Sequence, residues 1–423
     1  MIDPKILKEN PKAIREMLKR RKVSYPLDEL LELDGKRHEL IIETQDLRHR
    51  KNTLSQSIAS KKKNQESIEN ELDEMRNIGE MMNTAESKKV MVEKRYAELI
   101  YSIPNLLHTS VPTGNSEDDN VVVRTHEQHF KSRAKNDHVD LAHSLGLIDL
   151  ERAAKISGSR FYFLKKEIVK LNQALINYAL DFLEGYGYQL IQPPFMLKNE
   201  AIKGSIIMDD FQDVIYKIEN EDLYMIGTSE HAMASMHMDE ILDSVKLPLR
   251  YASISPCFRK EAGAHGKDMK GIFRVHQFEK VEQFVISDSA NSFDEQERMQ
   301  SISERFYQNL EIPFRVVLLC SADTGKVSSK TYDIEAWMPG QNKYREIGSC
   351  SNCIDFQARR LGIRHREKVN EATRLVHTLN STLVATERTM VAILENYQTS
   401  NQTVIIPTVL RKYMGDMKEI KST

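Results

Sequence analysis

Residues Cys257 to Val285 read CFRKEAGAHGKDMKGIFRVHQFEKVEQFV, and this stretch predicts two strands joined by a long polar loop. Arg259 and Glu261 lie two residues apart on the first strand, and side chains two apart share one face of a strand. The alternating set on the second strand consists of Arg274, His276, Phe278, Lys280 and Glu282. One face of the predicted hairpin therefore carries arginines, carboxylates and a flat ring.

Two interpretations fit this charged face. A solvated outer face with cross-strand ion pairs is common in sheets. The alternative is a binding surface, since arginine forks suit phosphate and carboxylate oxygens, a flat ring suits a purine, and carboxylates suit an ammonium group or a metal ion. The loop from Ala262 to Gly271 favours the binding surface, because its glycines would let it move as a lid over an anion. Its polar side chains include His265, Lys267, Asp268 and Lys270.

Length and composition limit the class of protein. A chain of 423 residues has room for two or three domains, and 40% hydrophobic residues suffice for a sizeable core. The net charge of -2 says nothing about partners, so any binding surface must be local. We expect a soluble, cytoplasmic protein without membrane contact, because the chain shows no long apolar run, no signal-peptide pattern and only four cysteines.

Cys350 and Cys353 form a single CxxC pair. Such a pair fits either a zinc site or two buried structural thiols. We favour buried thiols, because the sequence offers no second CxxC pair to complete a zinc site.

The region of residues 1–110 predicts a long helical arm at about residues 28–103. Leucines recur every seven residues, at Leu33, Leu40, Leu47 and Leu54. This heptad seam ends at a polar stretch, residues 60–65, where we expect the chain to reverse. A second apolar series then runs from Ile68 to Ile103, and the pattern as a whole predicts an antiparallel helical hairpin of coiled-coil type.

The two helices of this arm differ in charge. Residues 36–63 contain eight Lys or Arg and three Asp or Glu, whereas residues 64–99 contain five basic and nine acidic residues. A basic helix with a lysine tip suits a polyanion such as an RNA backbone. A dimerising coiled coil, or a solvated rod whose helices pair their charges with each other, fits the same pattern.

The remaining residues, 111–423, predict an α+β domain. Residues 111–149 are rich in polar residues and predict a linker, followed by an amphipathic helix over residues 168–182. Short strands are predicted at 188–192, 223–226, 251–258, 273–286, 314–319, 331–337, 343–349 and 404–407. Helices over 293–310 and 388–397 interrupt them without strict βαβ alternation, which indicates an antiparallel sheet flanked by helices.

Several long motifs resemble one family. FRKEAGAHGKDMKGIFRVHQFEKVE is similar to motif 2 of class II aminoacyl-tRNA synthetases, and its wording resembles the seryl-tRNA synthetases. QPPF at residues 192–195 resembles motif 1, a dimer-interface element, and GTSE at residues 227–230 resembles the serine-binding loop. DIEAWMPGQNKYREIGSCSNCIDFQARR and LNSTLVATERTMVAILENYQ resemble the family's signature run and motif 3. The N-terminal residues and the helical hairpin resemble the family's tRNA-binding domain, so the resemblance covers essentially the whole chain.

Motif 3 departs from the family's common bacterial wording. That wording is glycine-rich before the arginine, whereas this chain has Ser381, Thr382, Ala385, Thr386 and Glu387. The departure resembles the archaeal and eukaryotic branch. The arginine itself is retained as Arg388.

The resemblance implies a class II synthetase-like catalytic domain over residues 111–423, and a set of site residues. The catalytic residues would be Arg259, Arg388 and Glu346. The ATP-binding residues would be Arg259, Glu261, Arg274, Val275, Phe278, Glu346, Ile347, Ser349 and Arg388. The serine-binding residues would be Thr228, Glu230, Arg259, Glu282, Ser349, Asn380 and Thr382.

The implied cofactors and partners follow from the same resemblance. Mg²⁺ would be held through ATP by Glu346 and Ser349. The tRNA would contact the arm through Lys36, Arg48, Arg50, Lys51, Lys61, Lys62 and Lys63. Motif 1 implies a homodimer, the partners would be L-serine and serine tRNA, and selenocysteine tRNA is left open as a further substrate.

The implied reaction is a ligation in two steps. The serine carboxylate attacks the α-phosphate of ATP to give seryl-adenylate and pyrophosphate, and the acyl group then passes to the 3′ end of the tRNA. Two rival functions are an adenylate-forming paralogue that loads a carrier protein and a non-catalytic RNA-binding paralogue. The first would lack the long arm, and the second would lack residues such as Arg259, Arg274 and Arg388.

Overall fold

A computed structural model describes residues 1–127, 136–208, 213–261 and 270–422. Most of the predicted lid, residues 262–269 with His265, Lys267 and Asp268, lies outside these ranges. The chain divides into two compact units. The helical unit comprises residues 2–19 and 23–103, and the sheet unit comprises Met1, residues 20–22 and the chain from Pro104 onward.

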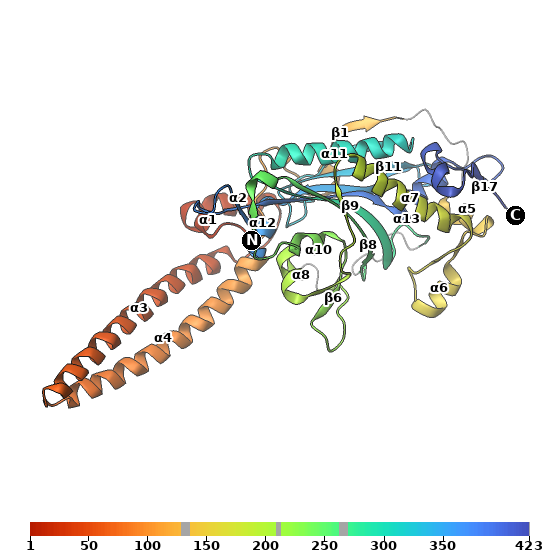
Figure 1. Cartoon of the computed structure of the whole chain (residues 1–423). Coiled ribbons are helices and arrows are strands. Elements are labelled where there is room, and N and C mark those ends of the chain that lie inside the picture. Colours follow the sequence, from red (N-terminus) through yellow and green to blue (C-terminus); the bar gives the residue numbers. More distant parts are fainter. Residues whose placement is uncertain (128–135, 209–212, 262–269, 423) are drawn as a thin grey trace. The chain divides into compact units, whose positions relative to one another are not determined.

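The helical unit contains the predicted antiparallel hairpin. Its helices are α1 (Pro4–Glu9), α2 (Pro11–Arg20), α3 (Leu27–Lys63) and α4 (Glu69–Ser102), drawn in red to orange in Figure 1. The seam between α3 and α4 buries Leu47, Ile78 and Ala85 against Leu54 and Met82. The predicted reversal at residues 60–65 begins too early, because the lysines of residues 61–63 form the last turn of α3. Cations are favoured there by the exposed carbonyls of a helix C-terminus.

The sheet unit is built on one eight-stranded sheet. In spatial order its strands are β1 (Val121–His126), β10 (Phe314–Leu318), β11 (Lys330–Met338), β12 (Lys343–Asn352), β15 (His377–Ala385), β9 (Gln277–Ser287), β8 (Leu249–Phe258) and β4 (Gln189–Ile191). Neighbouring strands are antiparallel, except that β4 runs parallel to β8. The α+β prediction is therefore confirmed.

Smaller elements complete the sheet unit. The short sheets are β14 (Arg374–Leu375) with β13 (Arg364–Arg366) and β7 (Ile241–Asp243), β16 (Val404–Ile405) with β17 (Glu419–Ile420), β2 (Ile148–Asp149) with β3 (Phe163–Leu164), and β5 (Met196–Lys198) with β6 (Leu223–Met225). The α-helices are α5 (His138–Ser144), α6 (Leu150–Ser157), α7 (Glu167–Gly185), α8 (Asn199–Ser205), α10 (Glu230–Ser235), α11 (Ser292–Asn309), α12 (Phe356–Leu361) and α13 (Thr386–Asn396). The 3-10 helices are Glu117–Asp119, Ser244–Lys246 and Thr408–Met414. None of the described helices is long and apolar enough to cross a membrane.

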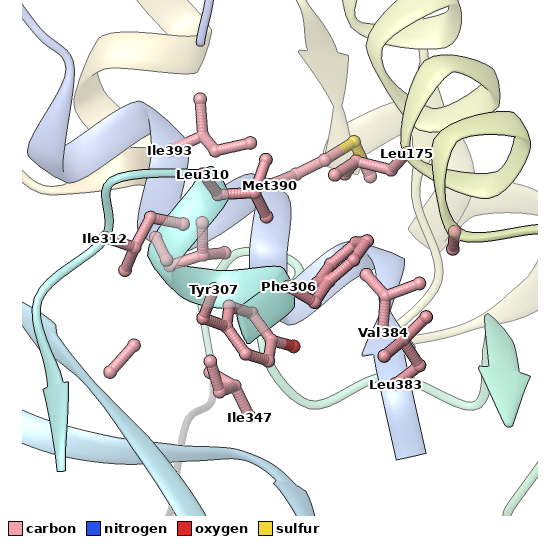
Figure 2. Packing of buried hydrophobic residues seen from close by; sticks show 14 of the residues in the cluster. Leu175, Phe306, Tyr307, Leu310, Ile312, Ile347, Leu383, Val384, Met390 and Ile393 are labelled. Atoms are coloured by element: carbon pink, nitrogen blue, oxygen red, sulfur yellow. The ribbon is translucent and has the colours of Figure 1, made fainter. Parts of the chain in front are cut away.

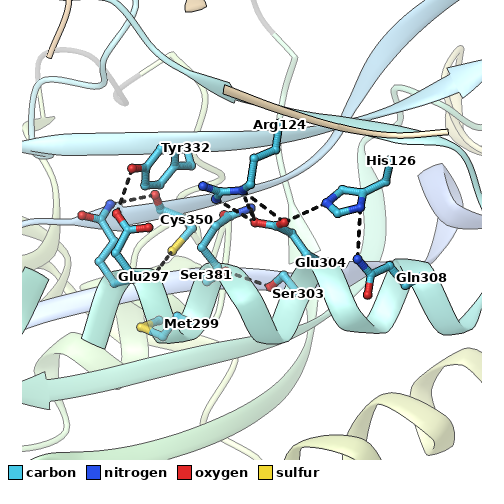
Figure 3. Close-up of polar contacts among 12 residues, drawn as sticks. Arg124, His126, Glu297, Met299, Ser303, Glu304, Gln308, Tyr332, Cys350 and Ser381 are labelled. Atoms are coloured by element: carbon cyan, nitrogen blue, oxygen red, sulfur yellow. Dashed lines mark hydrogen bonds and ion pairs between the residues drawn. The ribbon is translucent and has the colours of Figure 1, made fainter. Parts of the chain in front are cut away.

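The predicted linker, residues 111–149, is wrong in part because it contains the edge strand β1 and the helix α5. Five of the six residues of β1 are exposed. The strand therefore has no alternation of buried apolar and exposed polar residues that the sequence could reveal. Long-range polar contacts hold it instead. Arg124 donates to Glu304 of α11 at 2.7 Å, and His126 Nε2 lies 3.0 Å from the other oxygen of Glu304 (Figure 3).

Helices α7, α11 and α13 pack against one face of the large sheet (Figure 1). Figure 2 shows part of the resulting core, where Phe306 and Tyr307 of α11 meet Leu383 of β15 and Met390 of α13. Val281 and Val285 of β9 belong to the same core. Because strand side chains alternate, Glu282 and Phe284 point to the opposite face, which also carries the charged groups described below.

A close helix contact supports that opposite face and gives a first prediction. A Cβ added to Gly204 of α8 would lie 2.1 Å from Cδ2 of Leu361 in α12. We expect Gly204→Ala to lower the free energy of unfolding by about 1–3 kcal/mol through overpacking. Urea unfolding followed by the fluorescence of Trp337, the single tryptophan and a residue of β11, measures the sheet unit.

Gly185→Ala is the matched control. Gly185 ends α7, and a Cβ there would meet no atom within 4 Å. We expect this variant to be neutral or more stable by up to about 1 kcal/mol. Equal unfolding midpoints for the two variants would contradict the packing argument.

Candidate active site

Three predicted arginines lie at one end of the β8–β9 hairpin. Arg259 follows β8 directly, donates from Nε to the Gly227 carbonyl at 3.0 Å, and lies with its guanidinium carbon 5.3 Å from the centre of the Phe278 ring. Arg274 donates to Glu261 at 2.8 Å. Arg388 occupies the first turn of α13, where free backbone N–H groups favour anions.

These arginines line one cavity that is partly open to solvent. Its lining consists of Arg259, Glu261, Phe273, Arg274, Val275, Phe278, Ala385, Glu387 and Arg388. An adjoining open cleft is lined by Arg274, Arg388, Glu346 and Ser349 among others. The structure therefore brings together all the predicted ATP-binding residues except Ile347, whose side chain lies in the core under the sheet (Figure 2).

The predicted second strand of the hairpin begins too early. It was expected over residues 273–286, but β9 starts at Gln277, so Arg274 lies in the turn before the strand. The backbone of Glu261 has a positive φ of 50°, which also takes it out of strand geometry. Strand alternation thus applies to Phe278, Lys280 and Glu282, whereas Arg259 and Arg274 are positioned by their turn contacts.

Glu346 of β12 pairs with Arg388 across the open cleft. The Arg388 Nη1 atom lies 3.0 Å from Glu346 Oε2, and this guanidinium lowers the pKa of the Glu346 carboxyl. Asp333 and Glu335 of β11 face the same cleft, opposite Ser349 and Glu346 in the strand register. Burial, together with the Glu346 charge, raises the pKa of Asp333 well above its ordinary value.

Asp333 and Glu335 are site residues that the sequence analysis did not assign. The signal was present, because two acids two residues apart on a strand share one face. Oxygen ligands of this kind suit hard cations such as Mg²⁺.

A second cluster surrounds Glu282, which is 2% exposed. Its carboxylate accepts hydrogen bonds from Thr228 at 2.6 Å, Ser229 at 2.5 Å and Lys280 at 2.5 Å. Thr382 of β15 donates at 3.4 Å. Burial opposes ionisation of Glu282, but the Lys280 ammonium and the hydroxyl donors more than offset it and lower the pKa to about 2. The interpretation of Glu282 as a solvated surface charge is therefore wrong.

Glu230 at the start of α10 lies in a different electrostatic setting. Burial, and then the Glu282 charge, raise its pKa to about 7. Gln357 of α12 donates to its carboxylate at 2.9 Å, so a neutral amide rather than a cation contacts this acid directly. Neither Gln357 nor the pairing of Lys280 with Glu282 was predicted from the sequence. The signal for the pair was the two-residue spacing of Lys280 and Glu282, which places both side chains on one face of the strand.

The other predicted serine contacts lie on neighbouring strands of the same sheet. Asn380 of β15 is buried and donates to Cys353 Sγ at 3.8 Å, and Ser349 of β12 lines the open cleft. Cys350 and Cys353 are both buried, and burial raises the pKa of the Cys350 thiol to about 12. Zinc binds thiolates, so this environment favours the buried-thiol interpretation.

The predicted tRNA-contact residues all lie on α3, but their charges are differently engaged. Lys36 pairs with Glu32 at 2.6 Å, Arg48 with Glu86 at 3.0 Å and Arg50 with Glu74 at 3.8 Å. Lys61 pairs closely with Glu71 of α4.

The remaining three lysines, Lys51, Lys62 and Lys63, are exposed. Within the part of the chain that the structure describes, they have no carboxylate partner within 4 Å. They are the charges of the arm most available to an anion.

Comparisons with known proteins agree along the whole chain. The Seryl-tRNA synthetase N-terminal domain matches residues 1–107, and the tRNA synthetase class II core domain (G, H, P, S and T) matches residues 214–397. The serine–tRNA ligase of Nitrosopumilus maritimus is 55% identical over 99% of this chain and 100% of its own length. That of Pyrococcus horikoshii is 46% identical over 99% of this chain and 97% of its own length. The crystal structure of seryl-tRNA synthetase from Pyrococcus horikoshii complexed with ATP is similar with a TM-score of 0.93 at 45% identity, covering 100% of both chains.

The buried pair of Lys280 and Glu282 gives a second prediction. Lys280→Met removes the ammonium and leaves the Glu282 charge buried, so we expect a loss of about 3–5 kcal/mol in the free energy of unfolding. Adding Glu282→Gln removes that uncompensated charge and should recover part of the loss. Urea unfolding of both single variants and the double variant gives the coupling energy. Additive effects would show that the two groups do not depend on each other.

Proposed function

The chain belongs to the seryl-tRNA synthetase family, and from that premise we propose how its own residues carry out the reaction. The activity is that of an aminoacyl-tRNA ligase, which joins serine to tRNA with ATP. The observation that supports the residue roles best is the convergence of Arg259, Arg274 and Arg388 on one cavity beside the buried Glu282 cluster. The cavity suits the nucleotide, and the carboxylate cluster suits the amino acid.

The ATP-binding role rests on the chemistry of the cavity walls. The Phe278 ring supplies a flat apolar face for adenine, and Glu261 is placed near the base. Arg274 and Arg388 would bind the outer phosphates of ATP. Arg259 would bind the α-phosphate and the serine carboxylate, two anions that must approach each other. The serine carboxylate is already an anion, so the first step requires no strong general base.

Mg²⁺ would be held by oxygen atoms of Glu346 and Ser349, which face the same cleft as Arg274 and Arg388. When Mg²⁺ is bound, it would neutralise part of the negative charge of the phosphates. Asp333 and Glu335 lie opposite in register and would support that cation. The donor set consists of oxygen atoms, which fits a hard cation.

The serine-binding role rests on a pocket of buried hydrogen-bonding groups. Thr228, Glu230, Glu282 and Thr382 would bind the ammonium and hydroxyl groups of serine, with Asn380 and Ser349 on adjacent strands. Alanine would leave those groups unpaired, and the methyl group of threonine would clash. The pocket therefore favours serine over its nearest analogues.

For the second step we propose that α3 contacts the backbone of serine tRNA. Duplex RNA is generally recognised by shape and by phosphate and 2′-hydroxyl contacts. Selenocysteine tRNA carries the same kind of backbone and belongs in the same assay. We also propose a homodimer that forms through the motif 1 region around Pro193. A cytoplasmic location is proposed as well, and the four free buried thiols are consistent with it.

ATP–pyrophosphate exchange across amino acids tests the first step. We expect serine-dependent exchange, with alanine and threonine poorer by at least about a hundredfold. Arg388→Lys retains the charge but loses the guanidinium fork, so kcat/KM for ATP should fall by about 10- to 100-fold.

Arg250→Lys is the matched control for that variant. Arg250 holds Glu295 with the same kind of fork, at 2.6 and 2.9 Å, away from both cavities. Its exchange activity should remain close to that of the unmodified protein. Absence of serine-dependent exchange would favour a non-catalytic RNA-binding paralogue, and exchange followed by acylation of a carrier protein rather than tRNA would favour the carrier-loading paralogue.

Neutralising the free lysines of the arm tests the second step. The triple substitution of Lys51, Lys62 and Lys63 by Ala should weaken binding of serine tRNA and reduce the slope of log K against log salt by about 2 to 3. Exchange without tRNA should be unchanged. Lys368→Ala, at an exposed lysine of the sheet unit, serves as the control. Unaltered tRNA affinity and salt slope in the triple variant would contradict the assignment of these lysines.

A further inference from the structure

Glu387 lies in the part of motif 3 that is rich in glycine in the common bacterial sequence of the family. The reaction described above gives this carboxylate no role. Glu387 precedes Arg388 on α13, lines the same cavity as Phe278 and is 2% exposed. A carboxylate is costly to bury unless its oxygens are well supplied with donors. The contacts of Glu387 show where those donors come from.

Three donors from three segments converge on this carboxylate. The Tyr162 hydroxyl donates to Oε1 at 2.5 Å, the backbone N–H of Glu279 donates to Oε2 at 3.0 Å, and the Thr386 hydroxyl donates to Oε2 at 3.0 Å. Glu279 directly follows Phe278 on β9. The carboxylate therefore joins the start of α13 to the part of β9 that carries the aromatic wall of the cavity.

The segment that contains Tyr162 also holds the turn before β9. The backbone N–H of His276 donates to the Arg160 carbonyl at 3.2 Å, and the Phe161 ring stacks on the His276 ring with centroids 5.0 Å apart. Asn172 of α7 donates to the Glu279 carboxylate at 2.5 Å. Residues 160–162, β9, α7 and α13 are thus tied together around Glu387.

We propose that Glu387 is a positioning residue for ATP: its carboxylate fixes the separation between Phe278, on which adenine would stack, and Arg388, which would bind the phosphates. The inference rests on the proposed ATP-binding roles of those two residues. An ionised carboxylate accepts all three hydrogen bonds, whereas an amide of the same shape has one acceptor oxygen and donates from its nitrogen. The isosteric Glu387→Gln variant is therefore expected to lose at least one of the links.

The charge state of Glu387 supplies a second readout. Burial, and then the neighbouring Glu279 charge, oppose ionisation, the Tyr162 hydroxyl and the backbone N–H groups favour it, and the pKa is raised to about 7. The titratable and charged groups around it are the Tyr162 phenol from the segment before β3, the Glu279 carboxylate from β9 and Arg388 on its own helix. From α7, the neutral amide of Asn172 contacts the neighbouring Glu279 carboxylate. As the pH falls through this value Glu387 gains a proton and loses acceptor capacity.

The test measures ATP binding directly by calorimetry between about pH 6 and about pH 8. We expect Glu387→Gln to raise the Kd for ATP by about tenfold at the upper end of this range, the effect of a lost hydrogen bond to a charged group. We expect the Kd of the unmodified protein to rise toward the lower end, and this pH dependence to be smaller in the variant. ATP itself gains protons in this pH range, and this affects both proteins equally. The ratio of the Kd of the variant to the Kd of the unmodified protein at each pH therefore cancels its effect.

Tyr162→Phe tests the same link from the other side and covers the case in which Glu387→Gln fails to fold. It removes one hydroxyl and should raise the Kd for ATP in the same direction by about two- to fivefold. Tyr397→Phe is the matched control, because it removes a buried hydroxyl that donates to the Leu310 carbonyl at the far end of α13. Its Kd for ATP should stay within about twofold of the original.

Serine-dependent pyrophosphate exchange separates this inference from the proposed function. The variants should raise KM for ATP and leave KM for serine nearly unchanged. Equal increases in both KM values, or Glu387→Gln with an unaltered Kd for ATP and an unaltered pH profile, would overturn the positioning role. Absence of serine-dependent exchange in the unmodified protein would overturn the proposed function, while the Kd comparison would still decide the role of Glu387.

Discussion

The site depends on the compensation of one buried charge, the carboxylate of Glu282. A charge at 2% exposure on a central strand is tolerated only because the Lys280 ammonium and hydroxyls from the Thr228–Ser229 turn and β15 compensate it. These donors come from three separate segments, so compensating the charge also fixes the turn before α10 against β9 and β15. Folding and preparation of the pocket are therefore the same event in this part of the sheet.

The division of the sheet into two faces follows from the placement of the helices. With α7, α11 and α13 covering one face, apolar side chains such as Val281 and Val285 are buried there, and the alternate residues Glu282 and Phe284 are left to the other face. An ordinary sheet would cover that second face with aliphatic side chains. Here Phe284 and Ile286 are buried on part of that face, and Lys280 and Glu282 lie beside them. Arg259 and Arg274 reach the cavity from turns and Arg388 from α13, which leaves their convergent positive charge available for a polyanion.

Sequence pattern predicted the elements whose residues follow a simple period. The heptads of α3 and the alternation of Phe278, Lys280 and Glu282 on β9 are of this kind. It failed where long-range contacts decide the structure. β15 is a central strand, yet His377–Ala385 contains five polar residues, at positions 377, 378 and 380–382. Polar groups among them are satisfied by partners distant in the chain, as Thr378 is by Gln357 at 2.6 Å. β1 depends on Glu304, which lies 180 residues from Arg124.

The same physics separates the two acids of the proposed serine pocket. Glu282 already has a cation, Lys280, and its pKa is about 2, whereas Glu230 has the Gln357 amide and its pKa is about 7. Acids in one site whose environments push their pKa values apart have different tasks. Under the proposed function the charge of Glu282 is already neutralised by Lys280 of the protein. The carboxylate that would be stabilised most by the ammonium group of the amino acid is therefore Glu230. Binding of the amino acid would then complete the ionisation of Glu230, and an analogue without the ammonium group would leave it at its raised pKa. Selectivity of the proposed pocket for an α-amino acid would thus follow from leaving one of its two acids without a directly paired cation.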